Sequence, residues 1–168
     1  MVQVAGRMSL DETHARFQRN LVKSDLSVRF FANILRLKGY QVRVPDLVVS
    51  PTPGEHKEYA DTGDLFVDHP GYGVLRIEVK HLKVQFTSAL DWPYSPKFIV
   101  CGRDSWDRAS EKPFSYNILN RDKTHVAIVR GKTSSAWYVE KRPDERYGST
   151  YWQEFYFCPM EAVRFSEL

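Results

Sequence analysis

Cysteine is scarce in this chain: Cys101 and Cys158 are the two thiols among 168 residues. Neither belongs to a CxxC pair, and no histidine lies at a zinc-finger distance from either of them. The spacing therefore argues against a structural zinc site and predicts two buried free thiols.

Long apolar segments are also missing. No run of eighteen apolar residues occurs, and the N-terminus has no apolar stretch of the signal-peptide kind. We therefore expect neither a membrane span nor secretion. The expected setting is intracellular, either cytoplasmic or nucleoid-associated, and a phage-encoded protein fits the same expectation. A chain of 168 residues is most economically one domain, spanning 1–168.

Several common catalytic motifs are absent. The chain has no Walker loop, no GxSxG elbow and no GxGxxG fingerprint, so neither ATP dependence nor hydride transfer is indicated. The five histidines show no HExxH spacing. His81 follows Lys80 in a predicted strand, and strand alternation places the two side chains on opposite faces. A mechanism centred on histidine is therefore not expected.

Positive charge is concentrated in the N-terminal part of the chain. The net charge is only +3, yet residues 16–43 contain seven cations against the single acid Asp25. A cationic helix face could follow a phosphate backbone, although an ordinary solvated helix face explains the same pattern. The candidate nucleic-acid contacts are Arg16, Arg19, Lys23, Arg29 and Arg36.

The hydrophobic period divides the chain into segments. Residues 9–39 have helical spacing, as one bent helix or as two with a second start at Ser24, and Gly39 is placed to end the helix. Alternation then predicts a strand at 41–44 and a hairpin at about 62–81. Short strands are expected at 97–101 and in the aromatic-rich region of about 124–168. Residues 105–121 could contain one or two helices.

The hairpin at 62–81 carries the residues of greatest chemical interest. Strand signals at 64–68 and 74–79 flank a connection rich in proline and glycine. Alternation places Glu78 and Lys80 on one face of the second strand and apolar side chains on the other. Asp64 opens the first strand. The apolar set, expected to face a core, is Leu65, Val67, Leu75, Ile77 and Val79.

These polar residue types suit metal-dependent hydrolysis. Asp64 and Glu78 supply the carboxylates that Mg²⁺ commonly takes together with waters and substrate phosphate oxygens. The backbone carbonyl of Val79 is a candidate third ligand. Lys80 lies about 6.6 Å along the strand from Glu78, so its ammonium can reach the same phosphate or water. We therefore expect a site for Mg²⁺ or Mn²⁺ with Asp64, Glu78 and Lys80 as the catalytic residues.

Other residues compete for places in this site. Asp61 is an alternative first carboxylate, and Asp68 shares a predicted strand face with Asp64. Gln85 is a candidate substrate or water ligand, although a polar position in a strand extension is the favoured explanation.

The hairpin resembles the bipartite motif of the PD-(D/E)xK nuclease superfamily. The resemblance rests on two segments, GDLFV at 63–67 and IEVK at 77–80, within a region of about 24–129. It implies an α/β fold with a restriction-endonuclease-like core, in which helices flank a mixed central sheet in the order αβββαβ. It also implies cleavage of DNA with Mg²⁺ or Mn²⁺, metal ligation by Asp64 and Glu78, and catalytic charge on Lys80.

The match to the superfamily pattern is incomplete. Gly63 stands where a proline often precedes the first acid. The glutamate that many members carry on the first helix has no clear counterpart, although Asp25 lies at a comparable distance before Gly39 and could serve. A compact chain without an obvious recognition domain favours structure-selective or junction-resolving cleavage. Because cutting both strands of a duplex needs two sites, a homodimer is compatible with this expectation.

Two other functional classes stay open. A catalytically inactive nuclease fold would bind DNA with a steep salt dependence but would not cut it. A structural or protein-interaction module would make contact through the aromatic C-terminal segment. The aromatic content of 14% is compatible with stacking on unpaired bases, although rings in the core and at a possible dimer interface are the favoured explanation.

Overall fold

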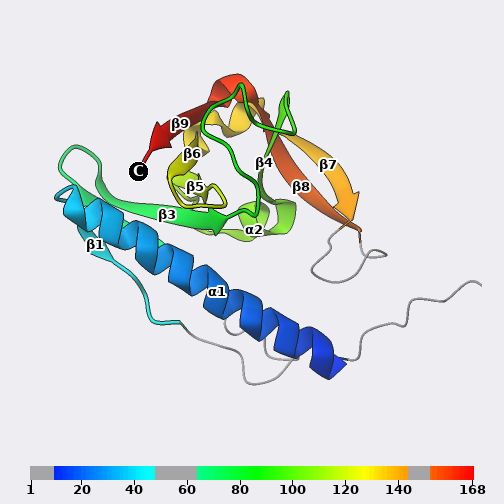
Figure 1. The fold of residues 1–168 in the computed structure, drawn as a ribbon, viewed down its shortest axis with the longest axis horizontal. Helices are drawn as coiled ribbons and strands as arrows, with labels where there is room; N and C mark the ends of the chain where they lie inside the picture. Colours follow the sequence, from blue (N-terminus) through cyan, green and yellow to red (C-terminus); the bar gives the residue numbers. More distant parts are fainter. Residues whose placement is uncertain (1–9, 48–63, 144–151) are drawn as a thin grey trace, which may run out of the picture.

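The structure, a computed structural model, describes residues 10–47, 64–143 and 152–168. Within these ranges a long helix, a six-stranded sheet and a three-stranded sheet make up the fold (Figure 1). The elements in chain order are α1 (Leu10–Leu37), β1 (Gln41–Arg43), β2 (Leu65–His69), β3 (Gly73–His81), β4 (Lys97–Gly102), α2 (Arg103–Arg108), β5 (Ser115–Leu119), β6 (His125–Arg130), η1 (Gly131–Ala136), β7 (Tyr138–Pro143), β8 (Trp152–Pro159), η2 (Met160–Ala162) and β9 (Val163–Glu167).

The larger sheet contains the hairpin of interest. Its strand order is β1-β2-β3-β5-β6-β9, and β3 and β5 are parallel whereas the other neighbouring pairs are antiparallel. The smaller sheet has the antiparallel order β4-β8-β7. The expected α/β class with a mixed central sheet is therefore confirmed.

Helix α1 is one continuous helix of 28 residues rather than two. It ends at Leu37, and Gly39 terminates it as predicted, with a φ of +90° that glycine readily adopts. The Gly39 N–H donates to the carbonyl of Arg36 at 2.9 Å, and the Tyr40 N–H donates to that of Leu35 at 3.1 Å. These two bonds satisfy carbonyls that the last helical turn would leave unpaired. Residue 9, the expected start, lies outside the described residues.

One core lies between α1 and the larger sheet. The helix runs along β3 (Figure 1), and its buried side chains meet the apolar face of the hairpin. Burial of each such aliphatic or aromatic side chain stabilises the fold by about 1.5–3 kcal/mol. The expected core set of Leu65, Val67, Leu75, Ile77 and Val79 is buried, which confirms the alternation. The core comprises Val28, Phe31, Ala32, Leu65, Val67, Ile77, Val79, Leu119 and Val126.

A second core lies between the two sheets and is rich in aromatic rings. Phe86, Trp92, Phe98, Tyr116 and Trp137 are buried in it, so these rings belong to the core rather than to the surface. Other rings, such as those of Tyr94 and Trp152, are exposed.

The two cysteines are buried free thiols, as predicted. Both lie in the core between the sheets. Burial raises the pKa of Cys158 to about 12, so its thiol stays protonated and unreactive at neutral pH. No helix among the described elements is long and apolar enough to cross a membrane.

The region 105–121 differs from the sequence-based expectation. Instead of one or two helices it contains the end of the six-residue helix α2 and the whole of β5, an interior strand of the larger sheet. All five residues of β5 are buried, including Ser115 and Asn117. The Asn117 side-chain amide donates to the Ser115 hydroxyl at 2.8 Å, which satisfies polar groups in an otherwise apolar layer. The sequence did not predict this strand, because an interior strand normally has a nearly continuous apolar sequence and these two positions are polar.

Candidate functional site

The hairpin of β2 and β3 brings the two predicted carboxylates to adjacent strands. Leu65 pairs with Ile77 in the antiparallel register. One residue further from the turn, the same register sets Asp64 beside Glu78. Both residues are half-buried. The side chains of paired residues point to the same face of the sheet, and this face is opposite to the one covered by α1. The sequence therefore placed the two carboxylates correctly relative to the core.

The Asp64 carboxylate is anchored to the backbone of β3. Its Oδ2 accepts a hydrogen bond from the N–H of Val79 at 2.6 Å. This N–H points toward the β2 side of β3, because the neighbouring even-numbered residues bond to the other side: the Arg76 carbonyl accepts from Phe114, and the Leu82 N–H donates to Leu119. The N–H and carbonyl of a strand residue point to the same edge. The Val79 carbonyl is therefore on the edge of β3 where the Asp64 carboxylate lies.

The Glu78 carboxylate is held by an arginine two residues before it on β3. Oε1 of Glu78 accepts from Nη2 of Arg76 at 2.8 Å and from Nε at 3.0 Å. The side chains are only 12% and 13% exposed, so the pair is largely removed from solvent. Nη1 of Arg76 donates to the Glu111 carbonyl at 3.0 Å. Sequence alternation put Arg76 on the Glu78 face but assigned it no role.

Lys80 reaches from β3 toward the smaller sheet. Its Nζ donates to the carbonyl of Val100 on β4 at 2.7 Å and lies 5.4 Å from the centre of the Tyr116 ring. Burial raises the pKa of the nearby Cys101 thiol, and the charge of Lys80 opposes part of that rise. Burial is also the main cause that raises the pKa of Tyr116. The ammonium is thus placed where the two sheets meet, near the Tyr116 ring and the Cys101 thiol.

The donor set suits a hard divalent cation. Among residues 10–47, 64–143 and 152–168, no group of three or more His, Cys, Asp or Glu side chains is arranged to hold a metal ion. Mg²⁺ needs fewer protein ligands, because it keeps several waters and is usually bound through one or two carboxylates and substrate phosphates. Asp64 and Glu78 on adjacent strands, with the Val79 carbonyl at the same edge as Asp64, match that requirement.

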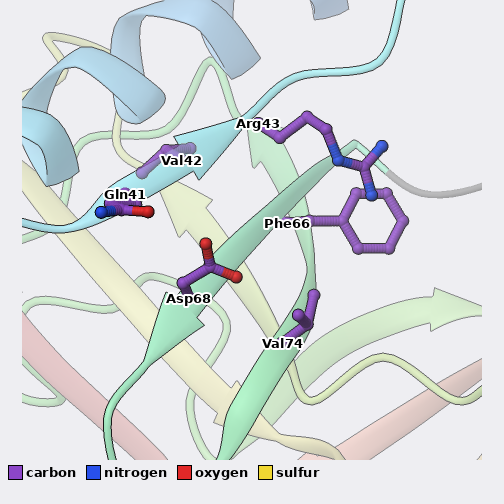
Figure 2. Close-up of a pocket in the computed structure, with 6 residues that line it drawn as sticks. All are labelled: Gln41, Val42, Arg43, Phe66, Asp68 and Val74. Atoms are coloured by element: carbon purple, nitrogen blue, oxygen red, sulfur yellow. The ribbon is translucent and has the colours of Figure 1, made fainter.

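Asp61 and Asp68 were the alternative carboxylates for the metal site. Asp61 lies outside the described residues. Asp68 is exposed at the far end of β2, about 13 Å along the strand from Asp64. It lines a shallow hollow with Gln41 and Val74, on the same side of the sheet as Phe66 (Figure 2). In this hollow the guanidinium of Arg43 lies 4.4 Å from the centre of the Phe66 ring.

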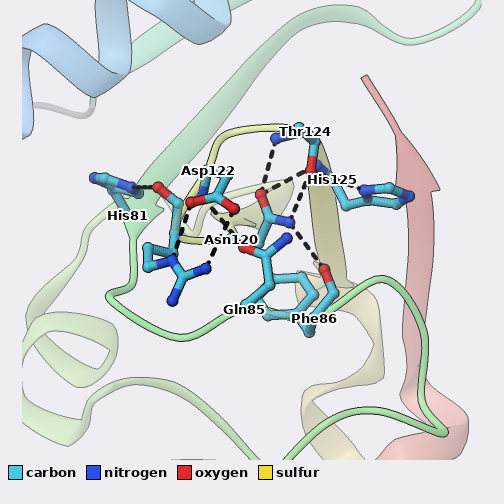
Figure 3. A network of polar contacts seen from close by, with 8 residues as sticks. His81, Gln85, Phe86, Asn120, Asp122, Thr124 and His125 are labelled. Atoms are coloured by element: carbon cyan, nitrogen blue, oxygen red, sulfur yellow. Dashed lines mark hydrogen bonds and ion pairs between the residues drawn. The ribbon is translucent and has the colours of Figure 1, made fainter.

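Gln85 belongs to a polar network at the exit of β3 (Figure 3). Its side-chain oxygen accepts from the Asp122 N–H at 3.3 Å. The His81 ring bonds to the carbonyl of Arg121 at 3.0 Å, on the strand face opposite to Lys80 as expected. The fully buried Asn120 donates to the Phe86 carbonyl at 2.9 Å. These contacts join the chain after β3 to the β5–β6 turn and give Gln85 a structural role.

Asp25 pairs with Arg29 on α1. The Nε of Arg29 donates to Asp25 Oδ2 at 2.8 Å, one helical turn apart. Val28 and Phe31 of the same helix pack on the sheet face opposite to Glu78. The structure therefore gives Asp25 a partner on its own helix.

The five candidate cations of α1 spread around the solvent side of the helix. Each residue of an α-helix is rotated by about 100° around the helix axis from the one before it, so the five positions span an arc of about 160°. Arg36 at one edge of this arc donates to the Val42 carbonyl at 2.8 Å and to Asn33 at 3.0 Å. Arg19, Lys23, Arg29 and Arg36 are exposed. The cations thus form a broad positive surface rather than one narrow stripe.

Comparison of the chain with protein-family models, with curated proteins and with solved structures finds no match.

Proposed function

We propose that this chain is a metal-dependent endonuclease that hydrolyses phosphodiester bonds in DNA, with Mg²⁺ or Mn²⁺ as its cofactor. The observation that carries the proposal is the bond from the Val79 N–H to the Asp64 carboxylate. This bond sets one acid at the edge of β3, beside Glu78 and Lys80 of the same strand. Two carboxylates and an ammonium at one end of a hairpin are the groups that phosphodiester hydrolysis with a hard cation requires.

The arrangement of elements supports the same proposal. If β4, which belongs to the smaller sheet, is set aside, the chain order is α1, β1, β2, β3, α2, β5. The first three strands form an antiparallel meander, and β5 returns parallel to β3. This order agrees with the αβββαβ core of restriction-endonuclease-like nucleases, in which the paired acids lie on the second and third strands.

Each polar residue has a distinct task in this mechanism. Asp64 and Glu78 would hold the cation together with the Val79 carbonyl. Bound there, the cation would lower the pKa of a water and neutralise charge on the phosphate oxygens. Lys80 would place its ammonium beside the phosphate or the attacking water, because its long stem lets the charge move away from Val100. The exposed cations of α1 would bind backbone phosphates at a distance from the reaction.

A cleavage panel tests the proposal. Linear duplex, single-stranded, flapped and four-way DNA are each incubated with the protein and Mg²⁺, with and without a chelator. We expect cleavage that needs the cation and falls about 100-fold or more in Glu78→Gln and in Lys80→Met. Lys83→Met is the matched control, because Lys83 is exposed just after β3. Intact DNA under every condition, together with no binding of Mn²⁺, would exclude the proposed activity.

The Arg76–Glu78 ion pair favours a second candidate, a nuclease fold that binds DNA without cutting it. A guanidinium already occupies Oε1 of the proposed metal ligand. In that case DNA binding would weaken steeply with salt, and neither the cation nor Glu78→Gln would change it. The same panel, scored for binding as well as for cleavage, separates the two candidates.

A further inference from the structure

The Arg76–Glu78 pair is the most enclosed of the ion pairs described in the structure. Its two side chains are 12% and 13% exposed, whereas every other ion pair within the described residues has at least one partner that is 43% exposed or more. Exposed pairs contribute little to stability, but a charge left without its partner in an enclosed position is strongly unfavourable. A cation that binds Glu78 through Oε1 must therefore compete with Arg76.

The guanidinium is held in a defined orientation. Two of its nitrogens bind Oε1 of Glu78, and the third donates to the Glu111 carbonyl. Because a backbone acceptor fixes the far side of the planar group, the near side stays directed at the carboxylate. Arg76 is therefore a preorganised counter-ion of Glu78 rather than a mobile surface arginine.

Among the described residues, the charges around Glu78 are balanced. Arg76 and Lys80 share its strand face, and Asp64 faces it from the end of β2. Two cations thus lie beside two carboxylates. A divalent cation added to this group would leave it with excess positive charge, which repels the cation and attracts an anionic phosphate.

We propose that Arg76 acts as a built-in competitor of the metal ion for Glu78, so that divalent cations bind tightly only together with the phosphate of the substrate. This inference rests on the proposed function, because it takes Glu78 as a metal ligand. Arg76 is a positioning residue in this scheme. Its displacement from Oε1 by the cation brings its positive charge next to the incoming phosphodiester.

The coupling has a thermodynamic consequence. If the phosphate of DNA raises the affinity for the cation, the cation raises the affinity for DNA by the same factor. Removal of the Arg76 charge should strengthen the binding of cation alone and weaken the coupling between cation and DNA. A purely structural arginine would show neither effect.

The experiment measures Mn²⁺ binding to the full chain by calorimetry, with and without a short single-stranded oligonucleotide whose phosphorothioate linkages resist hydrolysis. Arg76→Met should bind Mn²⁺ alone about tenfold more tightly than wild type, and the oligonucleotide should improve its binding less. Arg108→Met is the matched control, since Arg108 is an exposed arginine paired with Asp104. Arg76→Gln, which keeps a hydrogen-bond donor without the charge, provides a second variant if Arg76→Met does not fold.

The outcomes separate the inference from the proposed function. Mn²⁺ binding that is lost in Glu78→Gln but is equal or weaker in both Arg76 variants would overturn the inference alone. Absence of Mn²⁺ binding in wild type and in both Arg76 variants, with or without the oligonucleotide, would overturn both. Binding by the Arg76 variants but not by wild type would support the inference in its strongest form.

Discussion

The Oδ2 atom of Asp64 accepts a hydrogen bond from the backbone N–H of Val79 at 2.6 Å, across the end of the β2–β3 hairpin. The side chain thereby satisfies a strand donor that lies beyond the paired end of β2. It also sets a carboxylate beside the side chain of Glu78, the residue that precedes Val79 on β3. One contact thus serves both the fold and the proposed chemistry, and substitutions can separate the two.

Asp64→Asn and Asp64→Ala should affect stability and cleavage differently. The asparagine oxygen can still accept from Val79, so the free energy of unfolding should change little, whereas alanine should lower it by about 1–3 kcal/mol. Cleavage should fall about 100-fold or more in both, because neither supplies a negative charge to the cation. Urea unfolding and the cleavage assay test the two effects, with Asp68→Asn on the same strand as the control. Cleavage by Asp64→Asn at the wild-type rate would assign the first carboxylate elsewhere.

Asn120 should be essential for the turn between β5 and β6. Its side-chain oxygen accepts from the N–H groups of Thr124 and His125, and its amide donates to the Phe86 carbonyl. Asn120→Ala would leave several buried groups unpaired, so we expect the free energy of unfolding to fall by about 2–4 kcal/mol. Asn33→Ala, at an exposed position on α1, should have little effect. Equal urea midpoints for the two variants would contradict this role.

Gly131 is required by its surroundings. A Cβ at this position would lie 2.2 Å from the backbone oxygen of Pro113. The backbone cannot easily move away, because the Gly131 N–H donates to the Phe114 carbonyl at 2.9 Å. Gly131→Ala should therefore lower the free energy of unfolding by about 1–3 kcal/mol.

A matched glycine provides the control for that experiment. At Gly71 an added Cβ would meet only the side chain of His69, at 3.6 Å. Gly71→Ala should leave the thermal midpoint close to that of wild type. A similar loss of stability in both variants would point to a general backbone effect instead of the contact with Pro113.

Asp91 should make stability depend on pH in the acid range. Its carboxylate accepts from the N–H groups of Thr87 and Ser88, and these bonds lower its pKa from 3.8 to about 2. The stabilisation is therefore fully present above pH 3.8 and is lost as the pH falls toward about 2. Asp91→Asn should lose less stability across this window than wild type. Parallel curves of melting temperature against pH would contradict the assignment.

Much of the hairpin could be predicted because strand alternation is a local property. Leu65, Val67 and Ile77 were assigned to the core from their spacing alone, and the structure buries them. The end of α1 was likewise predictable from Gly39, because glycine readily adopts the positive φ that terminates a helix. β5 could not be predicted in this way, because Ser115 and Asn117 satisfy each other in a buried layer.

The sequence by itself determined the elements of the hairpin and the face of each of its side chains, since these follow from a period of two along the chain. Only the tertiary structure decided which partners those side chains have. The pairing of Glu78 with Arg76 and the reach of Lys80 to Val100 depend on rotamers, burial and a second sheet distant in sequence. Local spacing carries no information on such contacts, because they form when separate segments pack together.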